Sequence, residues 1–198
     1  MDNYNNKAVN KQPLAAFLVT LFAALIMVAC LFLPYSSATG DHADWIDEHP
    51  DVIASEKMDM TYSEAKHLSM VEYATCYFML RNELWGNSFD AIVGTVIYVG
   101  LVMIIGAFSL TATVSAIFRK PITTIVFTVL AYGAFALQNW DYTDRGVIPG
   151  SSYDWGLAHT LFPLAAAITV GGAIWTLVLK RKAKKQLADS QDYTDIII

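Results

Sequence analysis

The sequence predicts an all-α integral membrane protein with four transmembrane helices, both termini in the cytoplasm and a large first outer loop that is partly helical. Three observations lead to this fold class: the hydropathy of the chain, the lengths of its apolar stretches and the positions of its basic residues. The 198 residues are 55% hydrophobic, above the roughly 45–50% of soluble domains. Four stretches hold the excess, and each approaches the about 20 apolar residues that a helix needs to cross a hydrocarbon core about 30 Å thick. With their interfacial ends, the predicted spans cover residues 14–34, 91–117, 122–140 and 155–179.

Basic residues fall mainly on one side of these spans. If the spans alternate in direction, the N-terminus (1–13), the turn 118–121 and the C-terminal segment 180–198 share one face of the membrane. They hold nine of the 13 lysines and arginines, whereas the two other loops hold 14 of the 18 acids. The positive-inside rule then places both termini in the cytoplasm of a protein of the cell membrane. The candidate inner-surface anchors are Arg119, Lys120, Lys180, Arg181, Lys182, Lys184 and Lys185.

The first apolar stretch has an alternative interpretation as a cleaved signal segment. Met27-Val28-Ala29-Cys30 loosely resembles the lipobox of bacterial lipoproteins, in which the cysteine is lipidated after cleavage. However, Leu31-Phe32-Leu33 continue the apolar run past Cys30, which favours an uncleaved helix with a buried cysteine. We expect Cys30 and Cys76 to be free thiols, because one lies in a span and the other in the outer loop.

The first outer loop, residues 35–90, divides into two parts. Residues 36–60 are acidic and contain Gly40 and Pro50, so an irregular structure is expected. Thr61 and Glu64 have the spacing of a capping box, which predicts a helix from residue 62 to about 84. Its apolar face is expected to rest on the membrane surface, to pack on this protein's own loops or to dock a partner.

The second and third spans form a predicted antiparallel hairpin, because only residues 118–121 separate them and Pro121 suits the first position of a helix. Small residues let membrane helices approach closely. The candidate helix-packing residues are Gly94, Gly100 and Gly106 in the second span and Ala167 and Gly171 in the fourth.

The second outer loop covers residues 141–154. Trp140, Tyr142, Tyr153 and Trp155 flank it, as in the aromatic belts at membrane interfaces. Beyond the basic run at residue 180, the tail is expected to be disordered, ending in the apolar residues 196–198.

A polar pocket is predicted near the outer ends of the third and fourth spans. Pro163 cannot donate to the carbonyl of His159, so this turn combines a free acceptor with an ionisable ring. Gln138 and Asn139 end the third span at a similar depth, and ionisable groups in spans are candidates for function. The alternative is a histidine that reaches water at the interface beside an ordinary proline kink.

No catalytic residue, metal site, cofactor or nucleic-acid partner is predicted. The histidines and carboxylates of residues 42–49 lack the ligand spacing of zinc sites. Glu64 and His67 lack a nucleophile elbow and a metalloprotease motif. The sequence therefore favours a non-enzymatic membrane protein that acts through contacts, as an accessory subunit or a self-associating scaffold. The expected partners are the lipid bilayer and a membrane protein or a second copy; the alternative is a small transporter or channel component with an outward-facing polar pocket.

Overall fold

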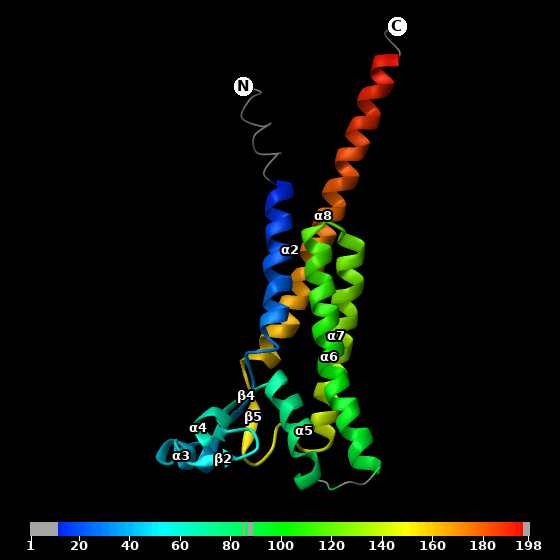
Figure 1. The fold of residues 1–198 in the computed structure, drawn as a ribbon. Coiled ribbons are helices and arrows are strands. Elements are labelled where there is room, and N and C mark those ends of the chain that lie inside the picture. Colours follow the sequence, from blue (N-terminus) through cyan, green and yellow to red (C-terminus); the bar gives the residue numbers. More distant parts are fainter. Residues whose placement is uncertain (1–11, 85, 87–88, 196–198) are drawn as a thin grey trace.

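A computed structural model describes residues 12–84, 86 and 89–195 (Figure 1). The chain is mostly helical, and four long helices run side by side: α2 (Gln12–Ala29), α6 (Phe89–Ile117), α7 (Pro121–Asp144) and α8 (Leu157–Asp195). Helix α2 packs against α6 and α8, and α7 packs against the same two helices. The four helices therefore enclose a common interior.

Three of these helices are long and apolar enough to cross a membrane, within residues 92–117, 121–144 and 157–186. The first of these segments has 26 residues, or about 39 Å at 1.5 Å per residue. It therefore exceeds a hydrocarbon core of about 30 Å and must tilt or extend beyond it.

Helix α2 differs from the span predicted at residues 14–34. Its apolar part, Leu14–Ala29, is shorter than the other three candidates, because the chain leaves α-helical geometry after Ala29 and enters a strand at Pro34. Between these points a tight turn keeps helix-like bonds: the Cys30 N–H donates to the Ile26 carbonyl, and the Leu33 N–H donates to that of Ala29.

The chain is mostly helical, as the predicted class requires, but the described residues also include five short strands at one end of the long helices. Strand β1 (Pro34–Ala38) is the centre of an antiparallel sheet, with β4 (His67–Ser69) on one edge and β5 (Tyr153–Trp155) on the other. Ser37 is paired with His67 in β4 and with Asp154 in β5. The sheet thus joins the two segments that the sequence assigned to separate outer loops.

The remaining elements of this end are small: α3 (Gly40–Glu48), β2 (Ile53–Ser55), β3 (Met60–Thr61) and α4 (Tyr62–Ala65), followed by α5 (Met70–Leu84). Strands β2 and β3 pair with each other. In Figure 1 all of them lie at the lower end, opposite the α6–α7 turn and the start of α2. We call the two ends of the molecule the strand end and the basic end.

The helix predicted over residues 62–84 is interrupted. The capping box is confirmed, since the Thr61 N–H donates to Glu64 and the Glu64 N–H donates to the Thr61 hydroxyl. The helix ends after one turn because residues 67–69 pair with β1 instead. A second box restarts it: the Ser69 N–H donates to Glu72 at 2.7 Å, and the Glu72 N–H donates to the Ser69 hydroxyl at 3.2 Å.

Two helices extend further than the sequence predicted. Helix α7 continues through the first residues of the predicted loop 141–154 and ends at Asp144. Helix α8 continues through the basic run to Asp195, although we expected a disordered tail. Residues 181–195 contain no glycine or proline and include the strong helix formers lysine, alanine, leucine and glutamine. Residues 1–11 and 196–198, parts of the two predicted cytoplasmic ends, lie outside the described residues.

Candidate functional site

The three residues of the predicted polar pocket lie near the strand end, where the last turns of α7 meet the first turn of α8. Gln138 belongs to the inward face of α7, together with Phe135 and Tyr142 at helical spacing. Asn139, one position further, is only partly buried. His159 is in the first turn of α8, immediately after β5. The structure therefore brings all three to one end of the molecule but gives each a different role.

Asn139 is tied to the central strand of the sheet. The fully buried Tyr35 of β1 donates its hydroxyl hydrogen bond to Asn139 Oδ1 at 2.5 Å. The Tyr35 ring makes edge contacts with Tyr73 and Phe135, with centroids 6.1 Å apart in both cases. Burial, reinforced by Tyr73, raises the pKa of Tyr35 far above its usual range. The Tyr35 hydroxyl therefore stays protonated at neutral pH and can donate its hydrogen bond to Asn139.

A second hydroxyl pair continues this arrangement. The buried side chains of Ser36 and Tyr73 are 2.8 Å apart at their hydroxyl oxygens, so one donates to the other. Burial raises the pKa of Tyr73 as well, although the hydrogen bond with Ser36 acts in the opposite direction. Because Tyr73 belongs to α5, neighbouring residues of β1 hold α5 and α7 together. Sequence reasoning missed this buried role of Tyr35.

His159 contacts aromatic rings. Its ring stacks on Trp155, with centroids 4.1 Å apart and planes inclined by 19°, and lies 6.3 Å from Phe135. Trp155 in turn contacts Tyr35 at 5.5 Å. These contacts connect His159 to Asn139 through two intervening rings.

Of the four residues expected in the aromatic belt, Trp140 alone is largely exposed, at 64%. Tyr142 points inward and is buried, while Tyr153 and Trp155 are partly buried in the sheet. Most of these aromatic residues therefore belong to a core between the sheet and the helices, not to a surface facing the membrane interface.

Gln138 has the least ordinary environment of the three. Its side chain is completely buried, and neither amide atom has a hydrogen-bond partner among the described residues. Ser109 Oγ of α6 and Thr128 Oγ1 of α7 are also buried without partners. An unsatisfied buried polar group costs roughly 1–3 kcal/mol, so these atoms suit a bound water or a polar solute.

The interior between the helices is rich in further hydroxyl groups. Several of them donate to the carbonyl four residues earlier, as in Thr20, Thr113 and Thr169. Such bonds satisfy the hydroxyl within its own helix. The interior therefore contains threonines whose hydroxyls are hydrogen-bonded within their own helix, beside the polar atoms of Gln138, Thr128 and Ser109 that have no partner among the described residues.

Of the five predicted helix-packing residues, Gly106 alone faces a neighbouring element closely. A methyl group at Gly106 would lie 3.3 Å from Leu31 Cδ1. At Gly94 it would meet only Tyr98 of the same helix at 3.9 Å, and at Gly100 and Gly171 it would meet nothing within 4 Å. Ala167 and Gly171 are exposed and line a groove of about 530 Å³ between α7 and α8.

The close contact between α2 and α8 is made by Gly172, which was not among the predicted helix-packing residues. A methyl group at Gly172 would lie 2.4 Å from Thr20 Oγ1 and 3.2 Å from the Thr20 nitrogen, so α8 meets α2 here. The spacing of small residues identified the correct helix, but it could not tell which of two adjacent glycines faces inward.

An apolar groove of about 560 Å³ lies between α5 and α6. We call it the α5–α6 groove. Phe78 of α5 and Met103 of α6 are 70% and 69% exposed on its walls, and Gly106 and Ala107 provide small surfaces between them. Phe78 lies outside the three candidate spans.

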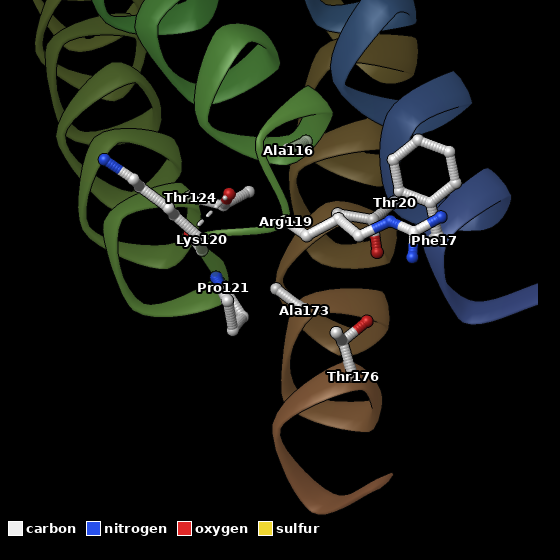
Figure 2. Close-up of a pocket in the computed structure, with 9 residues that line it drawn as sticks. All are labelled: Phe17, Thr20, Ala116, Arg119, Lys120, Pro121, Thr124, Ala173 and Thr176. Atoms are coloured by element: carbon white, nitrogen blue, oxygen red, sulfur yellow. Dashed lines mark hydrogen bonds between the residues drawn. The ribbon is translucent and has the colours of Figure 1, made fainter. Parts of the chain in front are cut away.

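The basic end contains the α6–α7 turn and the exposed lysines of α8. Arg119 adopts a left-handed conformation (φ +53°) and lies 4.8 Å over the Phe17 ring of α2. Lys120 extends in the opposite direction (Figure 2). Lys180 of α8 donates to the Arg119 carbonyl at 2.7 Å. The further basic residues Arg181, Lys182, Lys184 and Lys185 are all exposed.

Two cavities adjoin this turn. One, shown in Figure 2, has a volume of about 10 Å³ and is lined by threonines of α2, α7 and α8, so it could hold one water molecule. The other, of about 390 Å³, lies between Arg119, Lys120, the first residues of α7 and the α8 residues Leu177 and Lys180. We call the larger one the basic-end cavity.

Cys30 is buried and Cys76 partly buried, and both are free thiols. Among the described residues, no group of three or more histidine, cysteine or acidic side chains could hold a metal ion. His42 and His49 contact the aromatic rings of Tyr153 and Trp45 instead. His67, considered beside Glu64, has its Nδ1 3.0 Å from the Ser37 hydroxyl.

Comparison of the chain with protein-family models, with curated proteins and with solved structures gives no match.

Proposed function

We propose that the chain is a non-enzymatic protein of the cell membrane that crosses the bilayer four times and works as an accessory subunit of a larger membrane complex. Three helices have the length and hydropathy of spans. The fourth crossing is α2 with the turn that follows it, since helix-like bonds continue to Leu33 and bring the apolar run to the about 20 residues required.

The proposed orientation has both termini in the cytoplasm. The start of α2, the α6–α7 turn and the basic part of α8 lie toward one end of the molecule, and the sheet lies at the other (Figure 1). Lysines and arginines near span ends favour the cytoplasmic face. The strand end, with most of the acidic residues, would then face outward.

The α5–α6 groove carries the proposed function. Phe78, which is 70% exposed, projects from a helix that no candidate span includes, and it shares the groove with α6 span residues such as Met103. Large apolar groups exposed in this way mark contact surfaces. The small residues Gly106 and Ala107 would let a helix of another membrane protein approach the backbone of α6.

Charge favours a different protein over a second copy. Two copies in one membrane share the same orientation, so their strand ends, which hold most of the 18 acids, would face each other. Like charges brought together at an interface are unfavourable. The proposed partner therefore has an apolar transmembrane helix and a basic outer surface.

A photo-crosslinking amino acid at position 78 tests this proposal in native membranes. We expect one protein adduct from position 78 and only lipid adducts from position 22 of α2, where Phe22 is 62% exposed. Ala107→Phe should abolish the protein adduct by filling the groove, whereas Ala136→Phe, on an exposed part of α7, should not. Lipid adducts alone at position 78 would refute the contact; an adduct with a second copy would indicate the scaffold instead.

A small transporter or channel component is the second candidate, because polar atoms without partners are buried in the interior. Gln138, Thr128 and Ser109 come from two helices that line the same interior. Solute flux in proteoliposomes that is lost in Gln138→Leu, but retained in Leu137→Ala on the exposed side of α7, would support this candidate. Flux that is absent, or unchanged by Gln138→Leu and by His159→Ala, would eliminate it.

A further inference from the structure

The basic-end cavity differs from the other grooves because it combines charged and apolar walls. Lys120 and Lys180 approach it from the α6–α7 turn and from α8, while Ile122 and Leu177 complete it from α7 and α8. Its volume of about 390 Å³ is large enough for a small polar headgroup. The cavity therefore suits an amphiphile, with charged side chains for its headgroup and apolar side chains for its tail.

The positive charge of this cavity is not neutralised by nearby acids of its own walls. Residues 118–124 and 173–186 contain no aspartate or glutamate. Lys180 donates one hydrogen bond to the Arg119 carbonyl, which leaves two of the three donors of its ammonium group. Helix α7 begins at the cavity without a side-chain cap, so the positive end of its dipole adds to the field of the lysines.

The side chains of Arg119 and Lys120 leave the turn in different directions. Arg119 lies over the Phe17 ring on the α2 side, and Lys120 extends the other way (Figure 2). The Lys120 N–H donates to the Ser115 carbonyl at 2.9 Å. The backbone of the turn is thus anchored, which fixes the position from which the Lys120 side chain starts.

Apolar surface continues from the cavity along the long helices. Ile122 is 66% exposed and Phe118, next to the turn, is 69% exposed. Within the membrane orientation proposed above, these side chains meet the acyl region just beneath the headgroups. An ion without acyl chains would use only the charged half of this surface.

We propose that the basic-end cavity is a binding site for one anionic phospholipid, with Lys120 and Lys180 contacting the headgroup phosphate and Ile122 and Leu177 contacting the start of the acyl chains. The site differs from the diffuse attraction that any lysine near an anionic membrane exerts. It assigns a larger share of binding to Lys120 and Lys180 than to Lys184 and Lys185, which are exposed on α8 and are not part of the cavity.

Native mass spectrometry of the full chain in mild detergent tests this site. Dioctanoyl phosphatidylglycerol is titrated against dioctanoyl phosphatidylcholine, and the number of bound lipids is counted. We expect one phosphatidylglycerol to bind at least tenfold more tightly than phosphatidylcholine. The double variant Lys120→Gln/Lys180→Gln should weaken its binding about 30-fold or more, since each lysine hydrogen bond to a charged phosphate contributes at least about fivefold. The matched variant Lys184→Gln/Lys185→Gln should change it by less than about twofold.

Equal losses in the two double variants would overturn the site in favour of diffuse attraction. Equal binding of phosphatidylcholine would overturn the role of charge, and displacement by glycerol 3-phosphate at the same concentration would assign a free anion instead of a lipid. Circular dichroism of each variant checks that the helices are retained.

The lipid site rests on the proposed insertion into the membrane, which alkaline carbonate extraction tests separately. Release of the chain from membranes by alkaline carbonate would contradict insertion itself. Retention in the membrane without a preference for phosphatidylglycerol would contradict only the lipid site.

Discussion

The contact between α2 and α8 predicts opposite outcomes for two adjacent glycines. A methyl group at Gly172 would lie 2.4 Å from Thr20 Oγ1 and 3.2–3.3 Å from the Thr20 backbone, whereas one at Gly171 would meet nothing within 4 Å. Replacement of glycine by alanine in a helix contributes up to about 1 kcal/mol of helix propensity. This gain is common to both positions, so their difference measures the contact.

The magnitude follows from what must move. Thr20 Oγ1 donates to the Ala16 carbonyl at 2.7 Å, and the next nearest atoms belong to the backbone of α2, so a small rotation of one side chain does not relieve the clash. Overpacking of this kind costs about 1–3 kcal/mol. We therefore expect Gly172→Ala to be less stable than Gly171→Ala by about 1–3 kcal/mol.

The assay is reversible unfolding in mixed detergent micelles with increasing dodecyl sulfate, followed by circular dichroism. Thr20→Ala removes the nearest atom and should recover part of the loss in the double variant with Gly172→Ala; a coupling of about 1 kcal/mol between the two sites is expected. Equal stability of Gly171→Ala and Gly172→Ala would refute the contact. Destabilisation by Gly171→Ala alone would mean that the Ala167–Gly171 face makes the packing surface.

Three further predictions concern the strand end and the interior. Gln138→Leu should raise the free energy of unfolding by about 1–3 kcal/mol, because it removes two buried polar atoms without partners; the same detergent unfolding measures it, and destabilisation would indicate that the amide has a bound partner. Tyr35→Phe should lower stability by about 1 kcal/mol or more, since Asn139 Oδ1 loses its donor; an unchanged unfolding curve would contradict the hydrogen bond. Burial, followed by the charge of Glu72, raises the pKa of Cys76, so less thiolate is present at neutral pH than for a free cysteine. Maleimide labelling should therefore be slower than for a free cysteine, and its rise with pH should occur at a higher pH. Glu72→Gln should shift that profile to lower pH while retaining the cap of α5, whereas a profile unaffected by this change would rule out the electrostatic contribution.

The long helices could be predicted from the sequence because their signal is local. Twenty or more apolar residues have no alternative to a helix in lipid, and the candidate spans at 92–117, 121–144 and 157–186 lie where the hydropathy placed them. The start at Thr61 was equally local, because a capping box depends on residues three positions apart. The length of the helix that starts there could not be predicted locally, since the pairing of residues 67–69 with β1 decides where α4 ends.

The sheet could not be predicted for a related reason. Strands β4 and β5 have three residues each and pair with β1 across long stretches of chain, so neither shows an alternating pattern long enough to recognise. The candidate pocket residues lie at one end of the molecule, but the environments of Gln138 and Asn139 depend on the rotation of α7. Gln138 faces inward and Asn139 meets Tyr35, a residue more than a hundred positions away.

The place of β1 between β4 and β5 also sets the order in which the chain can be completed during synthesis. Strand β4 is made soon after β1, whereas β5 leaves the ribosome only after α6 and α7 have been translated. At about 5–20 residues per second, β1 waits for several seconds with one row of N–H and C=O groups open to any other extended segment. A ribosome that stalls between α7 and β5 would therefore leave a nascent chain with an unpaired strand edge, which stays open until β5 is translated and pairs with β1.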